Sequence, residues 1–223
     1  MFVRITIICL FLLNLYSLNS QVSIGGGFNS IGVIDVKNPY VGINLLGEYR
    51  EDDLGYFAKF YTTLPQFDSR SSLALDPIDP NEQYFYDLNV STNYKYNVLE
   101  FGKKYFYGKD LDFGFGGYLS SHLSLIMNTV NVQADKFDET RYKLPFGYSD
   151  KGKIYGIAAG LNAGAQYAFY YGTYYLDFGL NYIITSIPSK TLSQQQYMQN
   201  FSSYRQLFFV FNIGIKKTIF STY

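Results

Sequence analysis

Residues 111–125 read LDFGFGGYLSSHLSL, and they alternate between apolar and polar side chains. One phase holds Leu111, Phe113, Phe115, Gly117, Leu119, Ser121, Leu123 and Leu125. The other phase holds Asp112, Gly114, Gly116, Tyr118, Ser120, His122 and Ser124. Successive side chains of a β-strand point to opposite faces, so this stretch predicts a strand with one apolar and one polar face. It is longer than the ~9–11 residues that a tilted strand needs to cross a lipid bilayer.

Seven other segments show the same alternation. They are residues 22–28, 40–50, 54–64, 93–107, 154–169, 174–184 and 205–217. In the segment 93–107, Leu99, Phe101 and Tyr105 share one phase, whereas Tyr94, Tyr96 and Val98 share the other. Because a β-bulge shifts the phase of a strand by one residue, we expect a bulge near Val98.

The connections between these segments alternate between short and long. Residues 51–53, 108–110 and 171–173 predict tight turns, whereas the longer connections are residues 29–39, 66–83, 127–153 and 186–203. Outer-membrane barrels have short periplasmic turns and long external loops. We therefore predict an all-β fold, an eight-stranded antiparallel up-and-down transmembrane β-barrel, with both termini in the periplasm. The alternative is a soluble β-sandwich or lipocalin-like barrel, but its strands usually span about 5–6 residues and its apolar face points inward.

The composition agrees with a sheet embedded in lipid. Only 16% of the residues are charged and 20% are aromatic, with 24 Tyr, 20 Phe and no Trp. The mean hydropathy of −0.06 is too low for a bundle of transmembrane helices. Many tyrosines lie near the predicted strand ends, which is explained by aromatic girdles at the headgroup level or by the general strand propensity of Tyr. The formal net charge is zero, so nothing favours nucleic-acid binding.

The chain begins with the pattern of a secretory signal. Arg4 supplies a positive charge, residues 5–13 are apolar, and residues 17–20 are small or polar apart from Leu18. We predict a cleaved signal over residues 1–20 and a barrel domain over residues 21–223. The alternative, a transmembrane anchor, needs ~20 apolar residues. The single cysteine, Cys9, lies in this segment, so the predicted mature chain has no disulfide or thiol chemistry.

Charged and polar side chains fall in the phase that we predict to face the lumen. They are Glu48, Arg50, Lys59, Glu100, Lys104, Asp112, His122, Asp177 and Lys216. Eight strands enclose an interior that side chains can just fill, so paired charges are expected to plug it. The alternative is a narrow, gated path for ions. We predict no cofactor and no metal site. The acidic segment 76–82 offers oxygen ligands that could hold Ca²⁺ loosely, but it matches no calcium motif and also fits an ordinary exposed loop.

These features resemble the small outer-membrane β-barrel proteins common in Bacteroidetes, with a layout similar to the transmembrane domain of OmpA and to OmpX. The resemblance rests on the predicted signal, the eight amphipathic strands and the aromatic last strand, LFFVFNIGI at residues 207–215. It implies that the barrel-insertion machinery reads the last strand, with Phe220 or Tyr223 as its terminal aromatic residue. The following Lys216-Lys217-Thr218 departs from that pattern. The fold itself implies little about function.

His122 and Ser124 form the single arrangement that suggests catalysis. The pair resembles the His-x-Ser pair of outer-membrane lipid A deacylases, in which a base activates a serine. Here, however, the alternation puts both residues in the lumen phase, and a lipid substrate requires them on the membrane face. A lipid-modifying enzyme is therefore a second alternative function, after a narrow channel for ions or small solutes.

The main functional expectation is a non-enzymatic integral outer-membrane protein with a structural, surface-interaction or envelope-complex role. We expect the connections 66–83 and 127–153 to carry recognition. Candidate contacts there are Arg70, Arg141, Tyr142, Lys143, Phe146 and Tyr148. The expected partners are outer-membrane lipid and lipopolysaccharide, the barrel-insertion machinery during biogenesis, and an envelope protein that the sequence does not identify.

Overall fold

Ten β-strands form one antiparallel sheet in a computed structural model, which describes residues 20–34, 38–81, 85–108, 111–144, 151–188 and 207–221. The strands are β1 (Ser20–Val33), β2 (Tyr40–Glu51), β3 (Leu54–Thr63), β4 (Gln66–Pro77), β5 (Tyr86–Tyr107), β6 (Gly114–Ala134), β7 (Tyr142–Lys143), β8 (Lys151–Phe169), β9 (Gly172–Pro188) and β10 (Leu207–Ser221). Within the described residues, no helix is long and apolar enough to cross a membrane.

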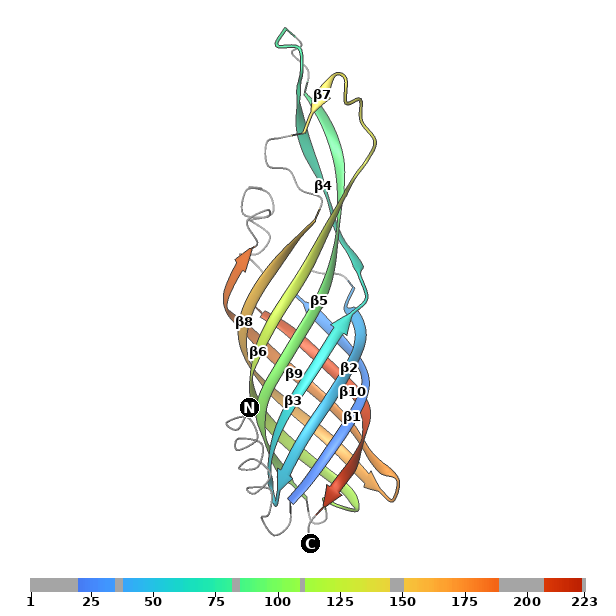
Figure 1. The fold of residues 1–223 in the computed structure, drawn as a ribbon, viewed down its shortest axis with the longest axis vertical. Coiled ribbons are helices and arrows are strands. Elements are labelled where there is room, and N and C mark those ends of the chain that lie inside the picture. Colours follow the sequence, from blue (N-terminus) through green and yellow to red (C-terminus); the bar gives the residue numbers. More distant parts are fainter. Residues whose placement is uncertain are drawn as a thin grey trace, which may run out of the picture.

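Eight of these strands close into a barrel, as predicted. Their order is β1-β2-β3-β5-β6-β8-β9-β10, and β10 returns to pair with β1 (Figure 1). The closure is extensive, because β1 and β10 pair from Gln21 opposite Ser221 to Val33 opposite Phe208. Every backbone edge in this circle therefore has a neighbour, which is the arrangement that lipid requires of a sheet.

The alternation in the sequence decides which face of each strand points outward. On β6, Phe115 and Leu123 are 70% and 58% exposed, whereas Tyr118 and Ser124 are buried. The same division holds on β9, where Phe178 is exposed and Asp177 is buried. At these positions the apolar phase thus covers the outer wall and the polar phase lines the interior, the reverse of a soluble barrel.

The predicted bulge near Val98 is wrong. β5 pairs with β6 without a register shift from Val90 to Tyr107, and its side chains keep a single phase throughout. Tyr94, Tyr96 and Val98 point inward even though they are apolar. The sequence suggests a change of phase because the interior itself changes from polar to apolar along the strand. Register shifts do occur between Val22 and Ser23, between Phe67 and Ser69 and between Ile157 and Ala158.

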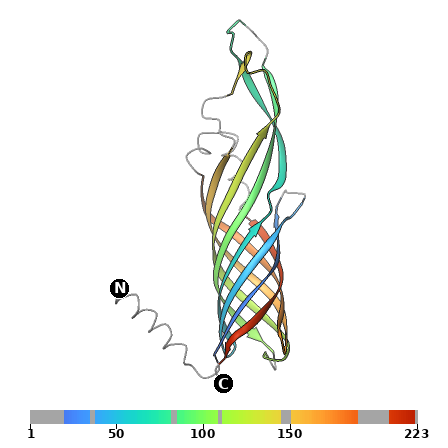
Figure 2. The ribbon, with the colours of Figure 1, turned by 45° about the vertical axis from the view of Figure 1, so that its right-hand side comes forward.

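Two connections predicted as long loops contain strands. β4 lies within the segment 66–83, and β6 runs on to Ala134 within the segment 127–153. Together with the first half of β5 and the short β7, these strands continue past the closed barrel (Figures 1 and 2). We call β4, β7, residues 86–96 of β5 and residues 127–134 of β6 the extension. β1 and β9 also run further than expected, to Val33 and Pro188.

The short turns lie at the end of the barrel opposite the extension. The first residues of β1 and the last residues of β10 lie at this end as well. Asp52 and Asp53 form the turn between β2 and β3, and Asp52 has a positive φ of 51°. Tyr170 and Tyr171 form the turn between β8 and β9, one residue earlier than predicted. Gln21 of β1 pairs with Ser221 of β10 at this same end. Residues 1–19, which make up the predicted signal apart from Ser20 of β1, lie outside the described residues.

Candidate functional site

The interior of the barrel is the candidate functional site. Eight of the nine predicted lumen residues are buried there, and the ninth, Asp112, is exposed at the mouth beside the short turns. The set comprises four basic side chains, Arg50, Lys59, Lys104 and Lys216, three buried carboxylates, Glu48, Glu100 and Asp177, the carboxylate of Asp112, and His122. Charge is therefore balanced within the lumen and its mouth when His122 is neutral, and buried charges are tolerated only when they are paired in this way.

Glu48 on β2 joins two lysines from distant strands. Lys104 Nζ on β5 donates to Glu48 Oε2 at 2.5 Å, and Lys216 on β10 donates to Glu48 Oε1. Lys104 Nζ also lies over the ring of Tyr118, 4.6 Å from its centroid. A lysine held between a carboxylate and an aromatic face is stabilised by both ion pairing and cation–π attraction. This cluster ties together the lower part of the barrel, nearest the short turns.

Asp177 on β9 forms the next cluster toward the extension. Its Oδ2 accepts from Lys59 Nζ at 2.9 Å and from the hydroxyl of Tyr118 at 3.0 Å. Its Oδ1 accepts from Asn212 Nδ2 at 2.6 Å. Asn44 lies alongside, with its Nδ2 3.5 Å from Asn212 Oδ1. Asp177 thus receives three hydrogen bonds from three different strands, which fixes the lumen side chains relative to one another.

Glu100 on β5 connects the polar network to His122. The Tyr61 hydroxyl donates to Glu100 Oε1 at 2.7 Å, and His122 Nε2 lies 3.4 Å from the same oxygen. His122 Nε2 also lies 2.7 Å from Asn181 Oδ1, to which the Ser124 hydroxyl donates at 3.5 Å. Both His122 and Ser124 therefore point into the lumen, as the alternation predicts, and both are at least nine-tenths buried.

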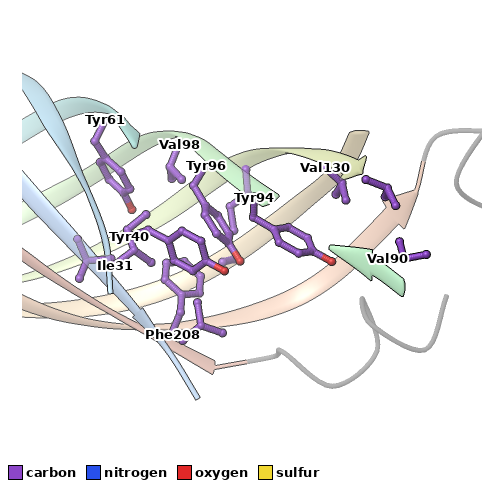
Figure 3. Close-up of a cluster of buried hydrophobic side chains, with 14 of the residues drawn as sticks. Ile31, Tyr40, Tyr61, Val90, Tyr94, Tyr96, Val98, Val130 and Phe208 are labelled. Carbon is purple, nitrogen blue, oxygen red and sulfur yellow. The ribbon is translucent and has the colours of Figure 1, made fainter. Parts of the chain in front are cut away.

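An apolar cluster fills the lumen above this network, toward the extension (Figure 3). Four tyrosines contribute to it, Tyr40, Tyr61, Tyr94 and Tyr96, and each is at most 7% exposed. The rings of Tyr40 and Tyr96 pack edge to face with their centroids 4.9 Å apart. Ile31, Val98 and Phe208 surround them. This lumen cluster was not predicted from the sequence, although the inward phase of β5, followed without a bulge, indicates it.

A cavity lies toward each end of the described part of the lumen. The larger one, about 300 Å³, opens at the end with the short turns and is lined by Glu48, Arg50, Asp112, Gln166 and Lys216 among others. Arg50 forms an ion pair with Asp112 at this mouth. The smaller cavity, about 40 Å³, lies among Tyr94, Tyr96, Asn128 and Phe208. Between these cavities, Lys59, Glu100 and Asp177 are each at most 1% exposed.

The predicted surface contacts lie on the extension where the structure describes them. Arg141 and Lys143 are exposed, and Tyr142 packs against Tyr86 with ring centroids 5.3 Å apart and the ring planes tilted by 32°. The side chain of Arg70 and the residues Phe146 and Tyr148 lie outside the described parts. In the same connection, hydrogen bonds from the Thr140 hydroxyl and backbone N–H lower the pKa of Asp138. This ordered turn presents Arg141 and Tyr142 at the tip.

No group of three or more His, Cys, Asp or Glu side chains in the described residues could hold a metal ion. The charged lumen side chains instead hydrogen-bond to one another.

Comparison with known proteins supports the fold. A major outer-membrane protein from Thermus thermophilus has a similar structure, with a TM-score of 0.53 and 10% identity, over 90% of this chain and 99% of that one. The fold is that of an outer-membrane β-barrel. Neisserial surface protein A (TM-score 0.44, 12% identity, 90% of this chain and 97% of that one) and Ail from Yersinia pestis (0.41, 14%, 90% and 99%) resemble it more loosely. No family model and no curated protein matches the sequence.

Proposed function

We propose that this chain is an integral outer-membrane protein that holds a surface-exposed β-sheet for interaction outside the cell, without channel or catalytic activity of its own. The observation that carries the proposal is the length of β5. It has 22 residues, but it pairs with β3 of the closed barrel only from Asn97 to Tyr105. A membrane-spanning strand needs about 9–11 residues, so roughly half of β5 lies beyond what lipid requires.

The outer wall supports insertion into lipid. Leu45, Leu119, Leu161 and Ile213 are each about half exposed or more, and they lie on four strands around the barrel. Apolar side chains exposed on this scale are rare on soluble monomers. The charged side chains of Glu48, Lys59 and Asp177 are instead buried inside, where they pair. In lipid this arrangement satisfies both faces of the sheet, because the wall is apolar and the backbone is fully paired.

The packing of the lumen argues against transport. A path for ions would have to pass Lys59 and Asp177, whose side chains are at most 1% exposed and bonded to each other. It would then have to cross the tyrosine cluster above them. The lumen is therefore blocked twice, first by an ion pair and then by an apolar cluster. This arrangement favours a plugged barrel over the alternative of a narrow channel.

The geometry of His122 and Ser124 argues against the lipid-modifying enzyme. Both side chains face the interior, and the hydroxyl of Ser124 donates to Asn181. A lipid substrate in the bilayer meets the outer wall, which at this level presents Leu123 and Leu125. The proposed role is therefore non-enzymatic.

The extension offers the features expected of an interaction surface. Ile78 and Phe85 near its tip are 50% and 68% exposed, and Arg141 and Lys143 lie on the neighbouring connection. Apolar and basic side chains side by side suit a protein partner on the cell envelope. We propose that both termini lie in the periplasm, where the exposed Phe220 at the end of β10 would contact the insertion machinery during biogenesis.

Cysteine labelling of intact cells tests this proposal. An Asp79→Cys variant near the tip of the extension should react with a membrane-impermeant maleimide on whole cells. The matched Asp53→Cys variant, in the turn between β2 and β3, should react only after the outer membrane is permeabilised. If only Asp53→Cys were labelled on intact cells, the barrel would have the opposite orientation to the one proposed. If both variants were found in the soluble fraction and labelled equally, the protein would not be inserted in the outer membrane.

A further inference from the structure

The larger lumen cavity, about 300 Å³, lies at the lower end of the size range of small-ligand sites and opens beside the short turns. Its inner wall is polar, because it includes the buried side chains of Glu48, Arg50, Gln166 and Lys216. Its rim is aromatic and exposed, with Phe113, Tyr170 and Tyr171. A polar inner wall below an aromatic rim suits a molecule that has one polar end and one apolar end.

Gln166 on β8 indicates that the cavity takes a ligand. Its side chain is 3% exposed, but its Oε1 has no hydrogen-bond partner among the described residues. A buried polar atom without a partner is costly, so it requires an explanation in a native structure. Of the described residues that line the cavity, no other has a buried side-chain atom in this condition. An N–H donor on a bound molecule would supply the missing hydrogen bond.

Lys216 on β10 brings a positive charge with unused donors to the same cavity. Its Nζ donates to Glu48 Oε1 and lies 5.4 Å from the centroid of the Phe106 ring. An ammonium group has three N–H donors, so this one hydrogen bond leaves two for a ligand. Glu48 does not balance Lys216 by itself, because the same carboxylate also binds Lys104.

The mouth of the barrel carries an excess of positive charge. Three cations lie there with two carboxylates, namely Arg50, Lys104 and Lys216 with Glu48 and Asp112. Both carboxylates already accept hydrogen bonds, Asp112 from Arg50 and Gln21 and Glu48 from the two lysines. The exposed Lys217 at the rim adds a further positive charge. Since buried charges need partners, a ligand with a negative charge would complete the pairing.

Lys216 and Gln166 reach the cavity from strands that are two apart in the sheet. Lys216 pairs with Thr173 on β9, which pairs with Ala168 on β8, two residues from Gln166. At the usual strand spacing and rise, the Cα atoms of Lys216 and Gln166 lie roughly 12 Å apart. Both side chains point inward, so their ends can bind neighbouring groups of one small molecule. The last residue of a peptide has such a pair of groups, a carboxylate and an amide N–H.

We propose that this cavity binds the C-terminal end of a peptide. The carboxylate accepts from Lys216, the last amide N–H donates to Gln166 Oε1, and the last side chain packs against Phe113, Tyr170 and Tyr171 at the rim. The chemistry is the same for a free short peptide and for the chain end of a protein. In the proposed orientation the cavity opens to the periplasm, so the ligand comes from there, but binding itself does not depend on the orientation.

Titration calorimetry of the full-length mature barrel, refolded in detergent, tests the proposal with N-acetyl-alanyl-phenylalanine as the probe. The acetyl group removes the amino-terminal charge, so the probe carries one negative charge. The same probe with a C-terminal amide should bind about ten- to a hundredfold more weakly, because hydrogen bonds to charged groups are the stronger ones. A ten-residue peptide with the same two last residues distinguishes the sources. Tight binding of this longer peptide indicates a protein chain end, and binding of the short probe alone indicates a free peptide.

Gln166→Met separates ligand binding from folding. Methionine is of similar length but offers no comparable acceptor, so the probe should bind about three- to tenfold more weakly. Because Gln166 Oε1 has no partner to lose, urea unfolding of this variant should show no loss of stability. A glutamine with a purely structural role would give the opposite pattern, with lower stability and unchanged affinity.

Charge variants at the mouth should move the affinity in both directions. Lys216→Gln should weaken binding of the probe about ten- to a hundredfold. Asp112→Asn removes a negative charge from the mouth and should tighten binding by up to about fivefold. Lys103→Gln is the matched control, because Lys103 lies on the outer wall against Tyr56 and Tyr105, and it should bind the probe normally.

Three results would overturn the inference. The first is equal affinity for the free acid and the amide, or no binding of either. The second is unchanged affinity in both Gln166→Met and Lys216→Gln, each with the heat-shifted gel band of a folded barrel. The third is binding of acetate with the affinity of the probe, which would mean a site for small anions only. If Lys216→Gln does not fold, Gln166→Met decides the second test alone. The labelling of Asp79→Cys reports the orientation separately, so failure of the proposed function and failure of peptide binding are distinguishable.

Discussion

Lys59 and Asp177 meet at 2.9 Å inside the barrel, although they lie on β3 and β9 and are 118 positions apart in the chain. The side chains of both residues are at most 1% exposed. Neither strand pairs with the other in the sheet. The ion pair therefore bridges the lumen and holds opposite walls of the barrel at a fixed separation.

Removing one partner of this pair should strongly destabilise the barrel. Lys59→Met leaves the Asp177 carboxylate buried beside Asn212 and Tyr118 without its cation, and the expected loss is about 3–5 kcal/mol of unfolding free energy. Urea unfolding of the barrel refolded in lipid vesicles measures it. Asp112→Asn at the exposed mouth is the control and should cost about 0–1 kcal/mol. Equal losses of unfolding free energy in both variants would mean that the buried ion pair stabilises the barrel no more than the exposed one.

Gly160 on β8 gives a second prediction about the lumen. A Cβ at this position would lie 2.4 Å from His122 Nε2 and 2.5 Å from Asn181 Oδ1, which are themselves bonded. Gly160→Ala should therefore cost about 1–3 kcal/mol, as overpacking does. Gly47→Ala, whose Cβ would have no neighbour closer than 4.0 Å, should be neutral or slightly stabilising.

The combined variant His122→Ala/Gly160→Ala separates steric clash from a general intolerance of alanine on β8. If the clash with the imidazole is the cause, the two changes together should cost less than the sum of the single changes. Strict additivity in urea unfolding would argue against the clash.

The turn between β2 and β3 depends on the left-handed backbone of Asp52. Its φ of 51° is unfavourable for β-branched residues, and aspartate tolerates it through local hydrogen bonding. Asp52→Val should cost about 1–2 kcal/mol. Among the described non-glycine residues Asp52 alone has a positive φ, so Asp53→Val is the matched control and should have a smaller effect in the same unfolding assay. A larger loss of unfolding free energy in the control would show that the stability of the turn does not depend mainly on the backbone conformation of Asp52.

Strand phase was readable from the sequence because lipid and lumen impose opposite chemistry on alternate residues. Glu48, Lys59 and Asp177 were assigned to the interior on this basis alone, and the structure buries all three. Their partners were not predictable, because contacts across the lumen depend on barrel radius and register rather than on sequence spacing. Glu48, for example, binds Lys216, which is 168 positions away.

The extension was missed for a related reason. Above the membrane both faces of a strand meet water or protein, so the outer face of β5 carries Asp87, Asn89 and Ser91 instead of apolar residues. Polar residues of this kind read as a loop in sequence. The strand is specified instead by the inward phase, Leu88, Val90 and Thr92. Beyond the lipid the alternation is therefore inverted, with apolar residues inside and polar residues outside.

The two closures of the lumen predict an electrically silent barrel. The mature barrel in a planar bilayer should show no discrete conductance steps. Tyr94→Ala/Tyr96→Ala should also be silent, because the ion pair of Lys59 and Asp177 still closes the path below. Reproducible steps in the unaltered protein would revive the channel alternative and contradict the proposed role.

The fold of the extension predicts where proteases can reach it. Leu88 is fully buried in the apolar cluster against which Phe137, Tyr142 and Leu144 pack. Leu88→Ala should loosen the segment 135–144, because a large-to-small change at a buried site costs about 2–5 kcal/mol and the loss falls on this local unit. Trypsin should then cleave faster at Lys136, Arg141 and Lys143 on intact cells, while the heat-shifted band of the barrel persists.

The neighbouring variant Asn89→Ala is the matched control, because its side chain is exposed on the other face of β5. It should leave the rate of cleavage unchanged. Equal cleavage in both variants would mean that the segment 135–144 is not held by the buried face of the extension. Faster cleavage in Leu88→Ala but not in Asn89→Ala would instead establish that buried apolar residues hold the extension together. These residues continue the apolar cluster of the upper lumen.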